Sequence, residues 1–276
     1  MKFFYYLFLI AFMAVSCHTE TDTQKAEHYL NEARRAVAES HYNQAKILLD
    51  SIHDCYPREV AIRRMAKHLA DTISVIENER TVFYCDSLIP LKYEEIKTAQ
   101  KNFRREEDTA YIDEARFVHR LLRTENNALR CYLQVKVGEK GTIFLKSMYC
   151  GRPIEHKSVE LHSKGLSVNA EGDNLHSFKL ENTHCETLLF SQNEAISLLH
   201  FINEYAQERI EVMLVGKSSS YPYVLMESER IAMAESYALS ILLSDYERLM
   251  QERRRADIRR NQSAKRLSLG SPDSEQ

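Results

Sequence analysis

The chain has 276 residues, with 37 Lys and Arg against 40 Asp and Glu, and its formal net charge is -3. A balance so close to neutral gives no support for nucleic-acid binding or for a strongly acidic substrate, because both require a basic surface. The length is sufficient for one large domain or two modest ones, each with its own hydrophobic core.

The first seventeen residues have the pattern of an export signal that ends at a cysteine. Lys2 precedes an apolar run over residues 3–15, which is shorter than the roughly 20 residues that a membrane-spanning helix needs. Small residues then lead to Cys17. This order resembles the lipobox of bacterial lipoproteins, with Ala14 where that motif more often has leucine. The alternative is an ordinary signal peptide with an incidental cysteine.

The resemblance to a lipobox implies that Cys17 is acylated and becomes the mature N-terminus. Residues 1–16 are then a signal peptide, and residues 17–23 are a tether. Position 18 is His18, whereas Asp at that position usually retains such lipoproteins in the inner membrane. We therefore expect an outer-membrane lipoprotein, on the periplasmic face or at the cell surface, with the membrane as its partner through Cys17.

Residues 24–130 are expected to be helical, beginning with a helix pair over residues 24–56. This stretch contains no Gly or Pro, and its apolar stripes are separated by a polar turn at residues 40–43. Residues 26–58 resemble one tetratricopeptide repeat at Tyr29, Ala33, Ala45 and Pro57. No second copy is evident, and about three repeats are needed for an independent solenoid. The pair is therefore expected to cap the helices that follow.

Beyond residue 58 the apolar residues recur every seven positions, as in a coiled coil. The first series is Ile62, Leu69, Ile76 and Phe83, and the series after Pro90 is Ile96, Phe103, Ala110 and Phe117. This spacing keeps one apolar side on a helix, so it predicts packing seams for a helical hairpin or for a partner helix. The helix is expected to fray or resume before residues 126–127.

Residues 131–252 are expected to form an α+β domain with a mainly antiparallel sheet. Alternating apolar residues predict a hairpin over 131–145 about the turn at 138–141, and short strands at 158–162, 166–170, 177–180, 187–190, 211–215 and 221–226. Ser191 and Glu194 form a capping box that starts a helix over 192–206. The complete chain is thus an α+β protein in which helices precede the sheet.

A last helix is expected over residues 228–255. Its predicted buried face consists of Ile231, Ala234, Ala238, Ile241, Leu242 and Leu249. Residues 253–276 are rich in arginine and poor in apolar residues, so they are expected to form a basic, disordered tail. Such a tail can bind anionic lipid headgroups, but a solvated helix end is favoured.

The cysteines leave the disulfide pattern open. Five cysteines follow Cys17, and an odd number cannot pair completely: Cys55, Cys85, Cys131, Cys150 and Cys185. Two lie in the helical part and three in the later part, so each part can hold at most one bond. Buried thiols that pack as small apolar residues are the alternative.

Catalytic motifs are absent from the sequence, and we expect neither an enzyme nor a cofactor. One cluster rich in histidine and cysteine could supply a metal site or a thiol with a base, namely Cys150, His156, His162, His176, His184 and Cys185. Its spacing matches no zinc pattern, so exposed histidines and buried thiols are favoured. Weak ligand-contact candidates are Arg152, in the loop 151–154, and His156, Tyr221 and Tyr223.

The order of these features resembles that of lipoproteins from anaerobic Gram-negative bacteria, and the resemblance implies location and domain order without an activity. We expect a lipid-anchored cell-envelope protein that acts as a non-enzymatic scaffold or interaction module. A protein partner would bind the helical part or the α+β domain. The alternative is a glycan-binding or hydrolytic module in the α+β domain, but no carboxylate pair accompanies its tyrosines.

Overall fold

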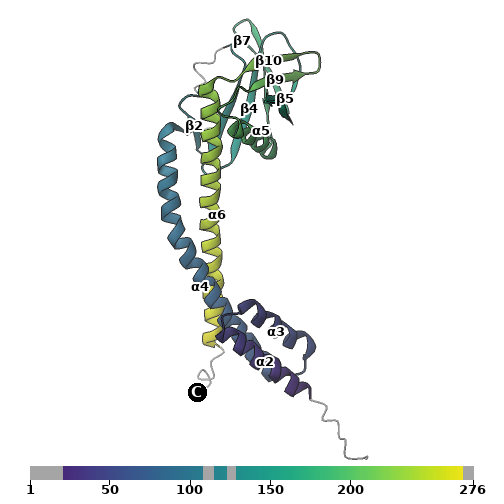
Figure 1. Ribbon diagram of the computed structural model, residues 1–276, viewed down its shortest axis with the longest axis vertical. Coiled ribbons are helices and arrows are strands. Elements are labelled where there is room, and N and C mark those ends of the chain that lie inside the picture. The colour runs from purple at the N-terminus through teal and green to yellow at the C-terminus, as the bar shows by residue number, and fades with distance from the viewer. Residues whose placement is uncertain (1–20, 108–114, 123–128, 270–276) are drawn as a thin grey trace, which may run out of the picture. The chain divides into compact units, whose positions relative to one another are not determined.

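The computed structural model describes residues 21–107, 115–122 and 129–269 (Figure 1). The predicted lipidation site Cys17 and the predicted signal peptide lie outside these residues. The chain divides into two compact units, which we name the helical unit (residues 1–83 and 253–276) and the sheet unit (residues 84–252). The predicted α+β class is confirmed. The boundary differs from the expected one at residue 131, because the strands begin at Phe103.

The helical unit begins with the predicted helix pair, α2 (Asp22–Ala38) and α3 (Tyr42–Cys55). Thr21 and Gln24 form a capping box that satisfies backbone donors at the start of α2. The facing surfaces bury Ala33 from α2 and Ala45 from α3 with no exposure, so the two helix backbones approach closely. Larger residues complete this small core, namely Leu30, Leu49, Ile52, Ile62 and Ile73. Burying each such side chain contributes about 1.5–3 kcal/mol.

The third helix, α4 (Val60–Ala99), is continuous and includes Pro90. The sevenfold series is only partly confirmed, because Ile62 is buried whereas Phe83 is 77% exposed. The two series do not form a helical hairpin with each other, because the helix continues through Pro90, and packing against a partner helix is the alternative that remains. The second predicted series is also wrong as a helix face, since the chain leaves the helix at Ala99 and Ala110 lies outside the described residues.

The residues after α4 form strands because they pair with the sheet. A short 3-10 turn, Gln100–Asn102, leads into β1 (Phe103–Glu106), which pairs antiparallel with β2 (Arg116–His119). Pairing of β2 with β3 (Tyr132–Gly138) adds both strands to a six-stranded sheet. Sevenfold spacing of Phe103 and Phe117 is compatible with a helix, but tertiary pairing decides the outcome.

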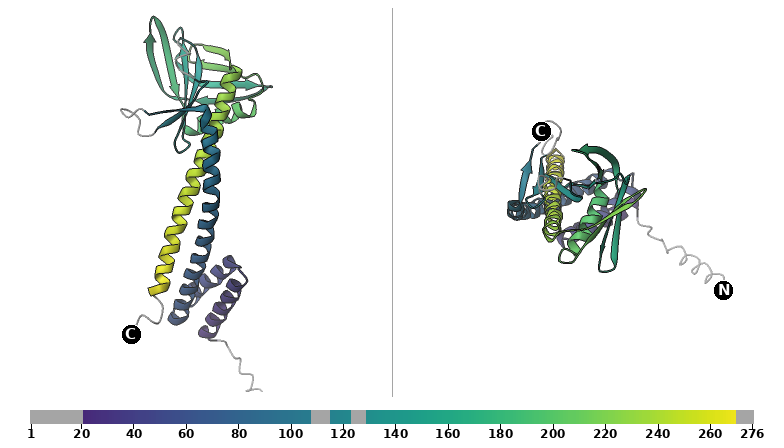
Figure 2. Two further views of the ribbon diagram at one scale, coloured as in Figure 1. Left: turned by 90° about the vertical axis from the view of Figure 1, so that its left-hand side faces the viewer. Right: turned by 90° about the horizontal axis from the view of Figure 1, so that it is seen from above.

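The predicted disordered tail is wrong over residues 253–269. These residues continue α6 (Glu227–Leu269), and within the helical unit they run antiparallel to α4 (Figure 2). Ser263 is 1% exposed and its hydroxyl donates to Ser74 Oγ at 3.0 Å, while Arg266 Nε donates to Asp71 Oδ1 at 2.9 Å. This seam is polar, which explains why an apolar pattern did not reveal it.

The sheet unit contains two antiparallel sheets. The larger sheet has the order β1-β2-β3-β4-β8-β7, and the smaller has the order β10-β9-β5-β6. The remaining strands are β3 (Tyr132–Gly138), β4 (Ile143–Cys150), β5 (His156–Ser163), β6 (Leu166–Glu171), β7 (Asp173–Leu180), β8 (Thr183–Leu189), β9 (Glu211–Gly216) and β10 (Ser220–Val224). Each predicted strand of residues 131–226 is therefore present, within a few residues at its ends.

Helix α5 (Gln192–Glu204) packs on the sheets and starts at the predicted capping box of Ser191 and Glu194. Its buried face, which includes Leu198 and Ile202, joins the core of the sheet unit. None of the helices in the described part of the chain combines the length and the apolar character needed to cross a bilayer.

The predicted buried face of α6 is shifted by about one position. Ile241 is 45% exposed, whereas the buried residues are Ala232, Met233, Ser236, Leu239, Ser240 and Leu243. Serines can occupy the buried face of α6 because their hydroxyl groups have hydrogen-bond partners. Ser240, for example, donates to the carbonyl of Gly141 at 2.8 Å. Gly141 has φ +86°, and a side chain there would collide with α6 at Ser240 and Ser244. This contact fixes the β3–β4 turn on α6.

Candidate functional site

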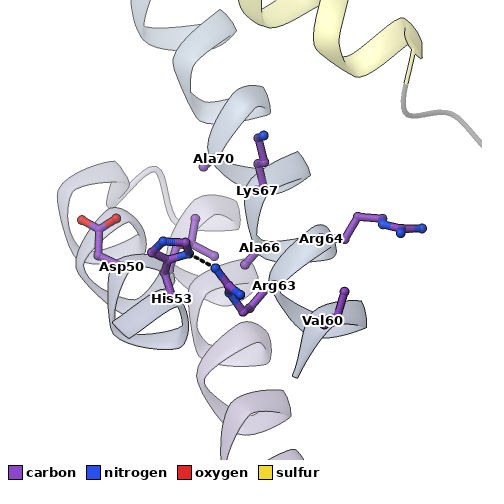
Figure 3. A pocket seen from close by; sticks show the side chains of 9 residues that line it. Asp50, His53, Val60, Arg63, Arg64, Ala66, Lys67 and Ala70 are labelled. Carbon is purple, nitrogen blue, oxygen red and sulfur yellow. Dashed lines mark hydrogen bonds between the residues drawn. The ribbon is translucent and has the colours of Figure 1, made fainter. Parts of the chain in front are cut away.

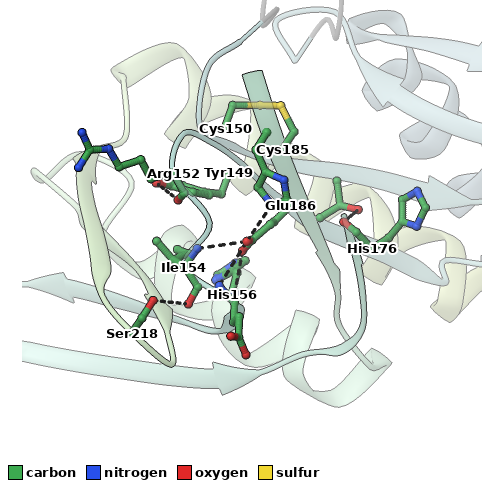
Figure 4. A network of polar contacts seen from close by, with 12 residues as sticks. Tyr149, Cys150, Arg152, Ile154, His156, His176, Cys185, Glu186 and Ser218 are labelled. Carbon is green, nitrogen blue, oxygen red and sulfur yellow. Dashed lines mark hydrogen bonds and ion pairs between the residues drawn. A yellow bond between two sulfur atoms is a disulfide. The ribbon is translucent and has the colours of Figure 1, made fainter. Parts of the chain in front are cut away.

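A buried carboxylate organises the polar centre of the sheet unit (Figure 4). Glu186 lies on β8, is 1% exposed, and accepts hydrogen bonds from the backbone N–H groups of three consecutive residues. The donors are Ile154 and Glu155 to Oε1 at 3.1 and 3.2 Å, and His156 to Oε2 at 2.8 Å. His184 Nε2 adds a fourth bond to Oε1 at 3.1 Å. Glu186 therefore anchors the loop that enters β5.

Hydrogen bonding outweighs burial in setting the charge of Glu186. Burial raises the pKa of a carboxyl group, but the bonds from the backbone of residues 154–156 and from His184 favour the ionised form. The net effect is a pKa below the usual glutamate range. A carboxylate that stays ionised and whose oxygens are occupied by four donors supports the fold, and it has no proton to give to a substrate.

His156 is part of a second buried chain of hydrogen bonds. Its Nδ1 lies 3.2 Å from the carbonyl of Val215, and since a carbonyl only accepts, Nδ1 carries the proton. In the neutral ring Nε2 then accepts from Ser147 Oγ at 2.6 Å. Burial lowers the pKa of His156, which keeps this tautomer neutral.

The Ser147–His156 pair has the connectivity of a hydroxyl activated by a base, but its burial gives it a structural role. Ser147 is 0% exposed and His156 is 1% exposed. A substrate has no route to the hydroxyl in this conformation. The His156 side chain points into the protein from β5 and is buried in this conformation, and ligand contact by His156 stays a prediction.

The other weak candidates lie around Tyr149. Arg152 is exposed. Its backbone carbonyl, and not its guanidinium, contacts Tyr149 by accepting a hydrogen bond from Tyr149 Oη at 2.9 Å. Tyr221 is 40% exposed and meets Tyr149 edge-on, with ring centroids 5.5 Å apart. The hydroxyl of Tyr223 is buried and has no hydrogen-bond partner among the described residues, and burial raises its pKa well above the usual value. Ligand contact by Arg152 and Tyr221 stays a prediction.

The proposed metal or thiol cluster is dispersed. Cys150 and Cys185 face each other on β4 and β8 and form a disulfide. His162 pairs with Glu160 at 3.4 Å, and His176 stacks on Phe178. Within residues 21–107, 115–122 and 129–269, no three His, Cys, Asp or Glu side chains are grouped to hold a metal ion.

Cys131 is a free thiol that directly precedes the neighbouring strand β3. Its sulfur lies 3.4 Å from the backbone nitrogen of Cys150 and accepts from it. Burial raises the pKa of Cys131, which favours the unreactive thiol. The half-buried Cys131 sulfur thus accepts a hydrogen bond at the end of β4, where the chain leaves the strand.

The helical unit contains an open cleft of about 560 Å³ between α3 and α4 (Figure 3). Its residues come from one side of each helix, at positions three, four and seven apart on α4. The lining residues are Leu49, Asp50, His53, Val60, Arg63, Arg64, Ala66, Lys67 and Ala70. Two rigid helices therefore hold a surface that is apolar at its base and basic along α4.

Arg63 fastens the α3–α4 connection at one end of this cleft. Its Nη1 donates to the carbonyl of Pro57 at 2.9 Å, and its Nη2 lies 2.9 Å from His53 Nδ1. Arginine only donates, so His53 Nδ1 accepts and the proton of the neutral ring is on Nε2. Arg63 is thereby engaged within the protein, and the cleft keeps its shape.

Arg64 and Lys67 are exposed, and in Figure 3 both side chains extend from α4 away from the bonded pair of His53 and Arg63. No hydrogen bond or ion pair joins either side chain to the described residues that line the cleft. The acidic side chain on the opposite wall is Asp50 of α3. The cleft thus offers two free cations next to apolar surface.

Neither the cleft nor the role of Glu186 was predicted from the sequence. The available signal for the cleft was the basic group Arg63, Arg64 and Lys67 on the polar side of α4, opposite the apolar stripe. The signal for Glu186 was a charged residue at an inward position of a strand, next to Cys185. Neither pattern matches a motif.

Comparison of the chain with protein-family models, with curated proteins and with solved structures finds no match.

Proposed function

We propose that this chain is a lipid-anchored protein of the cell envelope, held at the outer membrane through Cys17, and that it acts as a non-enzymatic interaction module. The observation that carries the interaction role is the α3–α4 cleft. Its walls are two packed helices, its lining combines apolar and charged side chains, and two of its cations have no partner in the lining. Rigid, amphipathic concave surfaces of this kind suit the binding of a protein segment.

The polar centre of the sheet unit supports a structural role for that unit. Glu186 is saturated by four donors, and Ser147 and His156 are bonded to each other in the interior. The tyrosine pair Tyr149 and Tyr221 is the feature that a glycan-binding module would share. The oxygens of the nearby carboxylate Glu186 are already hydrogen-bonded to backbone N–H groups. We therefore favour the interaction module over a hydrolytic one.

The lipid anchor is tested by metabolic labelling with a palmitate analogue. The wild-type chain is expected to take up label and the Cys17→Ala variant to lose it, because the thiol is the acylated group. A Cys131→Ala variant is the matched control and keeps the label. Label retained in Cys17→Ala would overturn the anchor.

The interaction role is tested by chemical crosslinking in intact cells that make the protein, followed by mass spectrometry of the adducts. A discrete adduct with another protein is expected, with crosslinked lysines that include Lys67. Recovery of the monomer alone, at crosslinker doses that capture other envelope complexes, would count against an interaction module.

A further inference from the structure

We propose that the α3–α4 cleft binds an acidic peptide segment of the partner, with carboxylates on Arg64 and Lys67 and apolar side chains on the base of the cleft. This inference rests on the proposed interaction role and specifies the chemistry of the bound segment. It uses the charges, the lining and the volume of the cleft, each of which is independent of the lipid anchor.

The charge of the cleft favours an anion. Among the lining residues, Arg63, Arg64 and Lys67 are cationic and Asp50 is acidic, so the lining carries excess positive charge on a chain whose net charge is negative. Arg63 is partly buried and its internal bonds prevent it from swinging away. Its fixed positive charge still adds to the potential that Arg64 and Lys67 present.

The apolar part of the lining selects a peptide over a free inorganic anion. Leu49, Val60, Ala66 and Ala70 line the same cleft as the cations. An apolar side chain gains free energy when it leaves water for such a surface, whereas phosphate or chloride does not. A volume of about 560 Å³ has room for a few side chains. A segment in which acidic and apolar residues alternate fits both features.

This chain has a rival segment of similar charge. Residues 270–276 contain Asp273 and Glu275 and follow Leu269, where the described part of α6 ends in the same unit. We assign the cleft to a partner because those seven residues contain no large apolar side chain to place on its base. A variant that lacks residues 270–276 separates the two occupants.

The test uses the full chain, purified in detergent, and a fluorescein-labelled peptide of alternating Glu and Leu, read by fluorescence anisotropy. Binding is expected to be at least about fivefold tighter than for the matched peptide of alternating Gln and Leu. The Arg64→Gln/Lys67→Gln variant is expected to weaken it about fivefold or more, since each charge pair at a rim is worth up to about 1 kcal/mol. The charge-retaining Arg64→Lys/Lys67→Arg variant keeps binding, which excludes loss of fold as the cause.

The matched control removes two exposed arginines of the same unit outside the cleft, as Arg254→Gln/Arg255→Gln, and is expected to change binding by less than about twofold.

An equal loss in both double variants would show non-specific attraction and overturn the site. Equal binding of the Gln and Glu peptides would overturn the acidic chemistry. Binding that appears only after removal of residues 270–276 would give the cleft to this chain's own segment. If crosslinking in cells finds a partner and one of these results is also obtained, the acidic-peptide inference is refuted. The proposed interaction role of the protein is not refuted in that case.

Discussion

Replacing Glu186 with glutamine tests the assignment of this carboxylate as the anchor of the β4–β5 loop. Glutamine keeps the shape but has one acceptor oxygen. If that oxygen takes the Oε1 position, it serves Ile154, Glu155 and His184 as a neutral acceptor, and the amide NH₂ then faces the backbone N–H of His156.

The cost of this change follows from the four bonds. One buried donor loses its acceptor, which costs about 1–3 kcal/mol, and three charge-assisted bonds become neutral, at about 1 kcal/mol each. We expect Glu186→Gln to lower the free energy of unfolding by about 4 kcal/mol or more. In a unit of this size, that corresponds to a melting temperature lower by about 8 °C or more.

The assay is denaturant unfolding of wild type, Glu186→Gln and the control Glu160→Gln, whose partly exposed carboxylate pairs with the partly exposed His162. The stability gap between wild type and Glu186→Gln should depend on pH. Because the folded pKa of Glu186 lies below the usual value, its contribution is complete above the pKa of the unfolded chain, about 4.3, and is lost as pH falls through the folded pKa. A gap below 1 kcal/mol at neutral pH, or one that widens in acid, would refute the reasoning.

Three further predictions concern the fold. Removing the disulfide as Cys150→Ala/Cys185→Ala should cost about 4 kcal/mol by the loop-entropy estimate for a sequence separation of 35, and equal midpoints in denaturant for variant and wild type would contradict this. Gly141→Ala should cost about 2 kcal/mol or more because of its positive φ and the contact with α6, and an unchanged melting temperature would argue against that contact. Asp71→Asn should loosen the packing of α6 on α4 by weakening the bond to Arg266, so amide exchange in residues 253–269 should accelerate; exchange at the wild-type rate would show that this bond does not hold α6.

The elements that sequence reasoning predicted are those in which local pattern and tertiary environment agree. The helix pair followed from small residues at helical spacing, as at Ala33 and Ala45, which the structure buries completely. The β3–β4 hairpin followed from strict alternation and from the turn that ends at Gly141. In the helix pair and in β4 buried positions alternate with more exposed ones, so the apolar period can be read from the sequence, whereas β3 is buried on both faces.

The failures occur where polar groups make the buried contact or where a partner strand decides the structure. Residues 253–269 pack through Ser263 and Arg266, so their buried face contains the residue types that signal exposure. Phe103 joins a sheet in spite of its helical spacing, because β2 offers it a partner. The candidate site was missed for a related reason, since Arg64 and Lys67 lie on the side of α4 that a search for apolar stripes ignores.

The central claim is that the α3–α4 cleft holds a partner protein, and site-specific photocrosslinking tests it most directly. A photoreactive amino acid is placed at Lys67 in the cleft and, as the control, at Arg254 on α6 of the same unit, and intact cells are irradiated. We predict a discrete adduct from position 67 that position 254 does not give, with the crosslink in an acidic segment of the partner. No adduct from position 67, or the same adducts from both positions, would contradict the claim.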